Sequence, residues 1–370
     1  MTEEWRLLTI NDYPGIKTQT IYHAVAVAME RYQDIPNTII ICWPADPVVC
    51  VGYHQIISEE VNLEYCHKNS IPIVRRCLGG GAVYLDEGQL FYQVIARLDS
   101  KKIPKRVADL YQLLLKAPIA TYQGIGIPAE YEPVNDIVAE GKKISGNGAA
   151  MVGGARVLTG NLIFDFNFDE MINILKVPSE KFRDKIAKTL RERLGTIRNF
   201  LSDNLPSRNE VKKLLIENFE KTLEVTFTVN DALSAKEQAI NEELITLYQS
   251  KDWLNLPLKR RTTLLQKRKV KISSSTQIYE SVYKAAGGLI RLILEVADNQ
   301  IKDIIISGDF SSEPMNAPEL IENQLIDQPL SEERIIKTLE RVYKEQQIEI
   351  PGISPADFSK SIMLSIEDLF

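Results

Sequence analysis

The sequence predicts an α+β protein of two domains: a mixed sheet with flanking helices over residues 1–255, and a small α+β domain over residues 265–370. Three observations lead to this prediction. The chain has 370 residues, which is the length of about two domains of ~150 residues each. Short β-branched runs, typical of strands, alternate with longer segments whose apolar residues follow a helical period. Residues 254–263 then combine a proline with a basic run, which indicates a boundary between domains.

Composition excludes several classes of protein. The chain is 44% hydrophobic and 25% charged, an ordinary globular balance. Its formal net charge of −6 provides no overall basic field that would attract nucleic acid. No run approaches the ~18 apolar residues of a membrane span, and the acidic start lacks the layout of a signal peptide. We therefore expect a cytoplasmic protein that has neither nucleic acid nor a membrane as a partner.

The cysteines favour a reducing compartment. All four lie in the first 77 residues without a C-x-x-C pair, and only three histidines occur. This pattern is typical of free thiols and not of a disulfide framework or a zinc site. The four are Cys42, Cys50, Cys66 and Cys77.

The elements of the first domain begin with a helix over residues 20–32, where apolar side chains recur at helical spacing. Three short β-branched strands follow, over residues 38–43, 48–51 and 71–74. Two further apolar runs, residues 82–85 and 90–98, flank an Asp-Glu-Gly sequence, which predicts a hairpin with its turn at residues 86–88.

The middle of the chain continues this alternation. A helix is expected around residues 108–116, and a strand over residues 156–166. Between them, residues 135–139 and 142–145 bracket Glu140-Gly141, which predicts a second hairpin. Dense charge over residues 178–198 indicates either a solvated helix or a mobile basic lid over a phosphate. Helical patterns then occupy residues 210–221 and 235–248.

The small C-terminal domain starts with a pair of strands. Residues 288–296 and 301–307 are apolar runs separated by an Asp-Asn turn. A helix is expected to start at Ser331, because acidic residues fill its first turn and apolar side chains share one face. A short helical stretch from Pro355 closes the chain.

The most informative segment is an arginine pair that runs into three glycines and then into an apolar strand, residues 75–86. Glycines leave a stretch without side chains, so backbone N–H groups can approach a bound anion. Arginines add permanent, fork-shaped positive charge beside it. The segment predicts a site for an anionic or activated group. Its candidate binding residues are Arg75, Arg76, Gly79, Gly80, Gly81, Ala82, Val83 and Tyr84.

A second segment, residues 135–148, complements the first. It places Lys143 on a strand directly before a Ser-Gly-Asn-Gly loop, one hairpin after an Asn-Asp pair. A lysine aimed at a carboxyl group and a phosphate can neutralise both as they approach each other. Asp136 is a candidate ligand for Mg²⁺, which favours one or two carboxylates plus substrate phosphates. The loop residues Ser145, Gly146 and Asn147 are candidates for donating hydrogen bonds to an acyl or phosphoryl oxygen.

Together the two segments resemble the lipoate–protein ligase and octanoyltransferase superfamily, which shares its catalytic fold with biotin–protein ligases. The order and spacing of the motifs match over roughly residues 5–175. Residues 287–310 also look like the small accessory domain of lipoate ligases, which in this chain is joined to the catalytic part. The resemblance therefore covers both halves of the chain.

The resemblance implies a role for each candidate residue. The arginines and the glycine loop would bind the acyl-adenylate, and Lys143 would be catalytic, contacting both the acyl carbonyl and the α-phosphate. Asn135 and Asp136 would bind ATP, with Asp136 also holding Mg²⁺. The charged residues 178–198 fall where such ligases have a loop that covers the adenylate. Apolar strands around Val83, Tyr84 and Ile73 would line a tunnel for an eight-carbon chain, lipoate or octanoate.

Two departures from the family pattern stand out. Many members carry histidine before the aspartate of the glycine motif, where this chain has Leu85. Many also carry His-His-Gly-Thr after the lysine loop, where residues 158–161 read Leu-Thr-Gly-Asn. Both changes indicate a divergent subfamily.

The superfamily contains two chemistries, and the sequence favours one. Ligases use ATP to make an acyl-adenylate, whereas octanoyltransferases take the acyl group from a carrier thioester, some through a cysteine. In that cysteine-dependent branch the nucleophile lies shortly before the lysine loop, and residues 120–135 contain no cysteine. Cys77, the one thiol near the motifs, is interpreted as a packing residue. The accessory domain also favours an ATP-dependent ligase, whose acceptor would be a lysine of a lipoyl-domain protein.

Two other hypotheses stay open. The chain could be a catalytically silent acyl-binding protein that keeps the fold, since fold does not imply function. The arginine–glycine motif together with Lys143 argues against this, because a binding module has no need of a lysine at the reaction centre. A biotin ligase would carry a Gly-Arg-Gly-Arg type of loop, which the sequence lacks.

Overall fold

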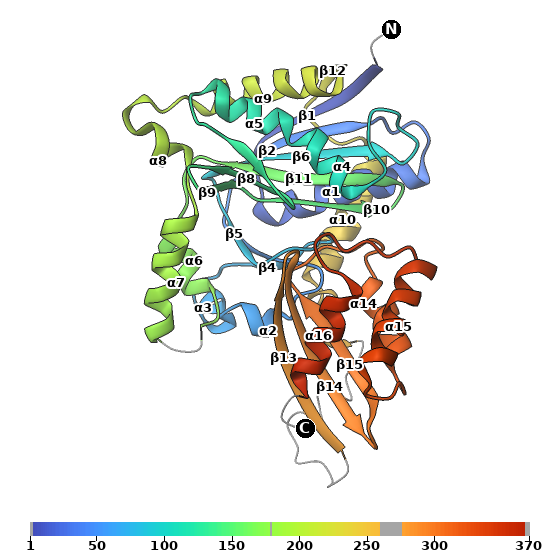
Figure 1. The fold of residues 1–370 in the computed structure, drawn as a ribbon. Coiled ribbons are helices and arrows are strands. Elements are labelled where there is room, and N and C mark those ends of the chain that lie inside the picture. The colour runs from blue at the N-terminus through green and yellow to red at the C-terminus, as the bar shows by residue number, and fades with distance from the viewer. Residues whose placement is uncertain (1–2, 178–179, 260–275, 367–370) are drawn as a thin grey trace. The chain divides into compact units, whose positions relative to one another are not determined.

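The computed structural model describes residues 3–177, 180–259 and 276–366, which form two compact units (Figure 1). The first unit comprises Met1–Cys50, Val61–Cys77 and Val83–Gln249. The second comprises Ser250–Phe370 together with two short segments from earlier in the chain, Val51–Glu60 and Leu78–Ala82. No helix among the described residues is both long and apolar enough to cross a membrane.

A six-stranded mixed sheet forms the framework of the first unit, with the strand order β10-β11-β6-β2-β1-β12. β1 pairs in parallel with β2 and β12, and the other neighbours are antiparallel. The strands are β1 (Glu3–Tyr13), β2 (Thr38–Pro44), β6 (Gln89–Arg97), β10 (Asn147–Val152), β11 (Ala155–Ile163) and β12 (Val225–Asn230). Every residue of β2 is buried, as expected for a strand at the centre of a covered sheet.

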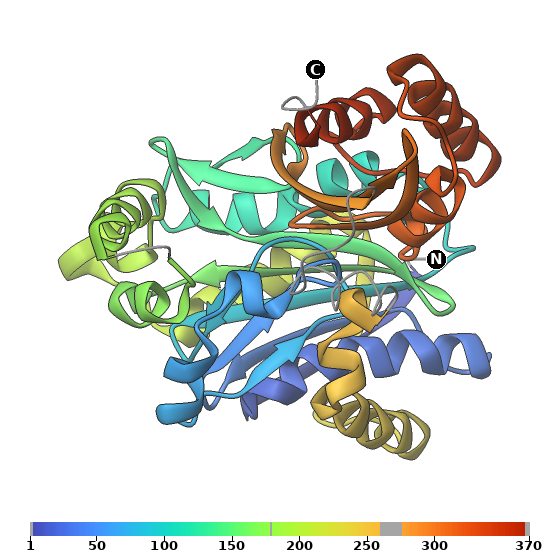
Figure 2. The same cartoon turned by 90° about the horizontal axis from the view of Figure 1, so that it is seen from below.

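Helices cover both faces of this sheet (Figures 1 and 2). On one face α4 (Val107–Leu114), α5 (Lys116–Gly124) and α9 (Arg208–Leu223) pack into the main apolar core. On the other face α1 (Gly15–Arg31) packs against β2, β6 and β11, and α10 (Ala235–Gln249) packs against α1. The α+β architecture predicted for this part of the chain is confirmed.

Two three-stranded sheets stand beside the large one. The first, in the order β4-β3-β5, contains β3 (Val48–Val51), β4 (Ile73–Arg75) and β5 (Val83–Leu85). The second, in the order β7-β8-β9, contains β7 (Glu130–Glu132), β8 (Asp136–Ala139) and β9 (Lys142–Ser145). The remaining helices of this unit are α3 (Leu63–Lys68), α6 (Phe168–Ile174), α7 (Glu180–Arg193) and α8 (Ile197–Leu201), with a 3₁₀ turn at Ser202–Asn204.

One predicted hairpin is confirmed and the other is wrong. The strands β8 and β9 pair across Glu140 and Gly141, which both have positive φ, as a tight two-residue turn requires. The turn at residues 86–88 exists, since Asp86 accepts the Gly88 N–H at 2.9 Å. Its flanking strands, however, join different sheets: β5 pairs with β3, and β6 already has β2 and β11 as neighbours.

An antiparallel meander and three helices form most of the second unit. The strands are β13 (Thr276–Ala285), β14 (Gly288–Ala297) and β15 (Gln300–Gly308), and the helices are α14 (Ala317–Leu325), α15 (Glu332–Glu345) and α16 (Pro355–Ser365). Earlier helices of this unit are α2 (Ile57–Glu60), α11 (Lys251–Leu254) and α12 (Leu256–Lys259). The predicted strand pair, its Asp-Asn turn and the two last helices are confirmed, whereas β13 was not predicted.

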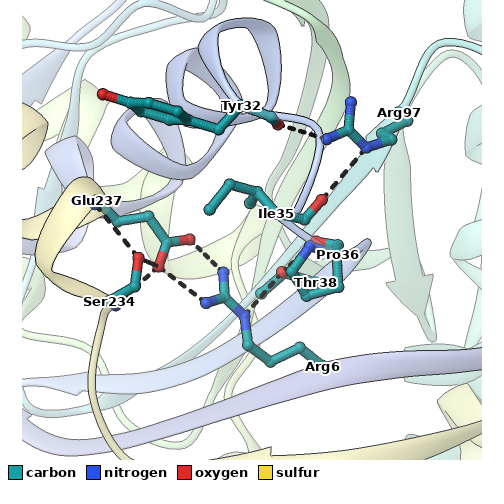
Figure 3. A network of polar contacts seen from close by, with 8 residues as sticks. All are labelled: Arg6, Tyr32, Ile35, Pro36, Thr38, Arg97, Ser234 and Glu237. Carbon is teal, nitrogen blue, oxygen red and sulfur yellow. Dashed lines mark hydrogen bonds and ion pairs between the residues drawn. The ribbon is translucent and has the colours of Figure 1, made fainter.

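A buried ion pair joins the N-terminal strand to α10 in the first unit (Figure 3). The Arg6 guanidinium donates to both carboxylate oxygens of Glu237, one of them at 2.8 Å, and to Thr38 Oγ1 at 3.1 Å. Ser234 adds its N–H at 2.8 Å and its hydroxyl at 2.7 Å to the same carboxylate. Burial alone would raise the pKa of Glu237, but the bonds from Arg6 and Ser234 outweigh it and lower that pKa below its usual range.

A second arginine of this network secures the end of α1. The Arg97 guanidinium donates to the carbonyl oxygens of Met29, Tyr32 and Ile35, at 3.0, 2.6 and 3.2 Å. These carbonyls belong to the last turn of α1 and the chain just after it, which have no intrahelical partner. A cation at this place also interacts favourably with the helix dipole.

We predict that Glu237→Gln lowers the free energy of unfolding by about 3 kcal/mol at pH 7, because it leaves a buried guanidinium uncompensated. The measurement is chemical denaturation of the two proteins. Glu333→Gln, which removes the carboxylate of the exposed pair with Lys337, is the control and should cost no more than about 0.5 kcal/mol.

The stabilisation by Glu237 should also depend on pH. A carboxyl group with a lowered folded-state pKa stabilises fully above its unfolded pKa, and this contribution disappears as the pH falls through the folded value. The difference between wild type and Glu237→Gln should therefore shrink in the acid range. An equal difference at every pH would contradict the assignment.

Candidate active site

The confirmed β8–β9 hairpin places a lysine and a carboxylate side by side. Lys143 on β9 forms an ion pair with Asp136 on β8, with 2.7 Å between Nζ and Oδ1. The two side chains are 41% and 29% exposed, so a substrate can reach both. The pairing of the two strands and their two-residue turn restrict the backbone at both residues. The Lys143 ammonium group therefore has a defined position next to the Asp136 carboxylate.

Hydrogen bonds from buried and half-buried side chains build the loop that follows Lys143. Asn135 and Asn147 bond reciprocally. The side-chain amide of Asn147 donates to the backbone carbonyl of Asn135 at 2.9 Å, and the side-chain amide of Asn135 donates to the backbone carbonyl of Asn147. Tyr92 on β6 donates its hydroxyl to Asn147 Oδ1 at 2.5 Å and lies 3.3 Å from the hydroxyl of Ser145. Burial raises the pKa of Tyr92, which keeps its phenol protonated as a donor.

A chain of amide hydrogen bonds connects the same loop to β5. The Gly146 N–H donates to Asn161 Oδ1 at 2.9 Å, and the Asn161 amide donates to Gln89 Oε1 at 2.8 Å. Gln89 in turn donates to the carbonyl of Tyr84 at 3.1 Å. In this structure the Gly146 N–H is thus already bonded within the protein. Anion binding by the loop residues stays a prediction, and their observed bonds hold the loop in shape.

Sequence reasoning missed several residues of this network. Tyr92, Gln89 and Asn161 were not candidates, although all three are buried. Tyr92 and Asn161 bond to the loop directly, and Gln89 is connected to it through Asn161. Gly160 is also constrained, because a Cβ there would lie 2.1 Å from Asn147 Oδ1 and 2.4 Å from the Tyr92 ring. The available signal was the polar Gln89 at the start of an apolar strand, since a buried amide needs partners.

The arginines and glycines of the first motif occupy different surroundings. Arg75 ends β4 and is completely buried, whereas Arg76 is half-buried and donates to the carbonyl of Cys50 at 3.3 Å. Val83 and Tyr84 lie on β5, where Val83 is 37% exposed and Tyr84 is buried. These four residues belong to the first unit, together with Asn135, Asp136, Lys143, Ser145, Gly146 and Asn147.

The glycine motif itself belongs to the second unit. Gly79, Gly80, Gly81 and Ala82 lie in the segment Leu78–Ala82. Gly80 has φ +92°, a conformation that side-chain-bearing residues rarely adopt. The structure therefore brings the lysine hairpin and its loop together within one unit and describes the glycines as part of the other.

All four cysteines are free and buried. Burial raises the pKa of Cys42 to about 12 and that of Cys66 to about 11, and it also raises the pKa of Cys50. Burial would likewise raise the pKa of Cys77, but interactions with His23 and with neighbouring tyrosine hydroxyls lower it below its usual value. Cys77 has no exposed surface, so no substrate carbonyl reaches its sulfur in this conformation.

The charged segment after residue 177 is largely helical. Residues 178 and 179 of the predicted lid lie outside the described residues, and Glu180–Arg193 forms α7. Exposed ion pairs join this region to the chain around α6: Arg191 with Asp169 at 2.5 Å and Arg198 with Asp165 at 2.8 Å. Just beyond α7, the Gly195 N–H donates to the carbonyl of Lys143 at 2.9 Å. The segment is thereby bonded to the strand that carries the candidate catalytic lysine.

Two family models match the chain. The model described as "Lipoyl protein ligase A/B catalytic domain" matches residues 22–220, more than half of the chain. The model described as "Bacterial lipoate protein ligase C-terminus" matches residues 277–362. A family model therefore matches each of the two parts that the resemblance predicted, the catalytic domain and the accessory domain.

Curated relatives include both ligases and transferases. Lipoate-protein ligase A subunit 1 of Thermoplasma acidophilum is 34% identical over 70% of this chain and 98% of its own. Lipoate-protein ligase LplJ of Bacillus subtilis is 28% identical over 90% of this chain and 93% of its own. Octanoyltransferase LipM of Brevibacillus brevis is 26% identical over 68% of this chain and 98% of its own.

Solved structures agree with this relationship. A bipartite lipoate protein ligase of Thermoplasma acidophilum, described with its E2 lipoyl domain, is 32% identical with a TM-score of 0.60, over 69% of this chain and 97% of the other. A lipoate-protein ligase A bound with ATP is 29% identical with a TM-score of 0.56, over 68% of this chain and 98% of the other. The sequence and the structure thus point the same way, and the chain belongs to the family of the lipoyl protein ligase A/B catalytic domain, here joined to a lipoate protein ligase C-terminal domain.

Proposed function

We propose that this protein is an ATP-dependent lipoate–protein ligase. The observation that carries the proposal is the half-exposed Lys143, paired with Asp136 on a rigid hairpin and followed by a loop that internal bonds hold in shape. This arrangement provides a preorganised positive charge where two anionic reactants must meet. Preorganised charge of this kind is commonly the largest single contribution to catalysis.

The reaction has two steps. In the first, a carboxylate oxygen of lipoate or octanoate attacks the α-phosphorus of ATP, and pyrophosphate leaves. In the second, the neutral amine of an acceptor lysine attacks the acyl carbonyl, AMP leaves with the bonding electron pair, and the amine proton passes to solvent. Lys143 would reduce the repulsion between carboxylate and phosphate in the first step and stabilise the negative oxygen that develops on the carbonyl in the second.

Several observations support ATP and a lipoyl domain as substrates. A structure similar to this chain is that of a ligase bound with ATP. Another is a ligase described with its E2 lipoyl domain, which supports a lipoyl-domain protein as the acceptor. The match to a lipoate protein ligase C-terminus supports the ligase, because we expect adenylation to need the accessory domain. An apolar tunnel discriminates only modestly between lipoate and octanoate, so both acids are candidate substrates.

The nucleotide and magnesium would be held by Asn135 and Asp136. Among the described residues, no group of three or more His, Cys, Asp or Glu side chains is placed so that it could hold a metal ion. A cage made only of protein ligands therefore does not fit, whereas Asp136 fits as one carboxylate that binds Mg²⁺ together with substrate phosphates. When bound, the ion neutralises charge on the phosphates. Asp136 would also restrict the position of the Lys143 ammonium group, with which its Oδ1 forms an ion pair.

The roles of the first motif remain those of the resemblance. Arg76 and the stretch Gly79–Tyr84 would bind the acyl-adenylate, as would Ser145, Gly146 and Asn147. The same role for Arg75 needs a conformation in which its side chain, completely buried here, becomes accessible. The segment around α7 would cover the adenylate, and its backbone bond to Lys143 supports that role. The reaction would take place in the cytoplasm. The catalytic domain would end at residue 255, and the accessory domain would begin at residue 265.

An octanoyltransferase is the second candidate, because relatives of similar identity carry that name. Such an enzyme could use a thiolate, and Cys77 has a lowered pKa. Its complete burial argues against this use, since a nucleophile must reach the acyl carbonyl. The ligase therefore has the stronger support.

We predict that Lys143→Ala reduces acyl transfer to less than about a tenth of the wild-type rate, which corresponds to a barrier increase of at least ~1.4 kcal/mol. The measurement is transfer of lipoate to a purified lipoyl domain. Lys142→Ala is the matched control, because its side chain points to the other face of the same strand, and it should keep most of the activity. Equal activity of the two variants would refute the role of Lys143.

We further predict lipoate-dependent exchange of labelled pyrophosphate into ATP with Mg²⁺, which measures adenylation without an acceptor. Cys77→Ser should retain this exchange, because the ligase uses no thiol. A folded protein that shows no exchange with lipoate or octanoate, but transfers octanoate from a carrier thioester in a Cys77-dependent way, would establish the transferase instead.

A further inference from the structure

The glycine motif lies against the backbone that follows β15, inside the second unit. A Cβ placed on Gly79 would lie 2.2 Å from the carbonyl oxygen of Phe310 and 2.5 Å from the Cα of Ser311. Both are backbone atoms, which cannot move aside as the tip of a side chain can. The next residue adds a bond, since the Gly80 N–H donates to the same Phe310 oxygen at 3.3 Å.

The three glycines therefore differ in what they require. Gly79 has no room for a side chain because of Phe310 and Ser311, and Gly80 has a positive φ. Gly81 has neither restriction: the nearest atom to a Cβ there is Asp309 Cβ at 3.8 Å, an ordinary contact distance. The approach of an anion to the backbone would require glycine equally at all three positions. The neighbouring atoms and the backbone angles, in contrast, require glycine at positions 79 and 80 but not at position 81.

His54 joins the same backbone segment from the other side. Its ring stacks on Phe310, with 5.0 Å between centroids and 23° between planes, and its carbonyl accepts the Gly308 N–H at 3.2 Å. His54 Nε2 lies 2.9 Å from Ser312 Oγ. The same Ser312 hydroxyl lies 3.0 Å from the Pro314 carbonyl oxygen, so this side chain connects the His54 ring to the backbone just beyond Phe310.

The two early segments of this unit also hold each other. The Tyr53 N–H donates to the Leu78 carbonyl at 2.9 Å. A Cβ on Gly52 would lie 1.8 Å from the Gly80 carbonyl oxygen, so the chains cross backbone to backbone. Farther along, Glu60 accepts from Arg291 at 3.0 Å, and Ile56 packs against Ile293 and Ile305. The segment Val51–Glu60 thus contacts the glycine motif near its start and the meander towards its end, and so connects the two.

We propose that residues 308–312 are a positioning element for the glycine motif, and that Gly79 is a glycine because the Phe310–Ser311 backbone occupies the space of a side chain. Its consequence for catalysis rests on the function proposed above, in which this motif binds the acyl-adenylate. The C-terminal part of the chain then acts on adenylation by holding the motif in its working conformation. Phe310, Ser312 and His54 are positioning residues and touch no substrate in this account.

The structural part of the proposal is tested without any substrate. Amide hydrogen exchange is measured in the full chain for the Gly80 and Gly308 N–H groups, which bond to Phe310 and His54. Gly79→Ala should accelerate exchange at both amides by about tenfold or more, since local opening controls exchange. Gly81→Ala, the same chemical change two residues on, should leave both protected. Unchanged protection in Gly79→Ala, or equal acceleration in both variants, overturns the proposal.

The functional part uses a pair of matched core substitutions. Phe310 and Phe358 are both completely buried in the same unit, and their rings meet edge to face at 6.2 Å, but only Phe310 stacks on His54. Phe310→Leu should lower kcat/KM for lipoate-dependent pyrophosphate exchange about tenfold and accelerate Gly80 exchange, because small displacements of a binding group are costly. Phe358→Leu should change neither by more than about twofold.

Equal losses in the two phenylalanine variants would show a general stability effect and overturn the positioning role. A wild-type protein without pyrophosphate exchange would refute the proposed function. In that case the amide exchange of Gly79→Ala and Gly81→Ala still decides whether residues 308–312 hold the motif.

Discussion

The candidate active site depends on the reciprocal hydrogen bonds between Asn135 and Asn147. These two side-chain amides join the turn directly before β8 to the first residue of β10, so they close the segment that contains the lysine hairpin. Tyr92 then attaches the closed loop to the central strand β6. A buried polar group without a partner costs about 1–3 kcal/mol, so these bonds are strongly favoured together and leave Lys143 on a backbone with little freedom.

The ion pair between Lys143 and Asp136 places two charged side chains on this hydrogen-bonded segment. The carboxylate restricts where the ammonium group lies, and both remain exposed enough to meet a substrate. In the proposed function, a bound nucleotide would bring several negative charges to the same place. The lysine would pair with those charges and the carboxylate would share a metal ion with them, so that one ion pair would serve both components of ATP–Mg²⁺.

The boundary between the two compact units does not coincide with the domain boundary expected from the sequence. The chain from Val51 to Glu60 and from Leu78 to Ala82 falls in the matched catalytic-domain region, yet it clusters with the C-terminal meander. Backbone contacts at Gly79 and the stacking of His54 on Phe310 explain this clustering. In the proposed function, binding of the acyl-adenylate by this motif would therefore depend on the backbone that follows β15.

The sequence by itself determined the family, the α+β class, and the lysine hairpin with Asn135 and Asp136, because hairpin turns and short motifs are local and their spacing is written in the chain. Only the tertiary structure decided that Tyr92, Gln89 and Asn161 complete the loop, since Tyr92 lies 53 positions from Ser145 and Gln89 lies 72 from Asn161. It also placed β5 and β6 in different sheets, because pairing depends on which strand edges are free. The reason for a glycine at position 79 likewise lies in the backbone of a distant segment, and no local pattern can carry that information.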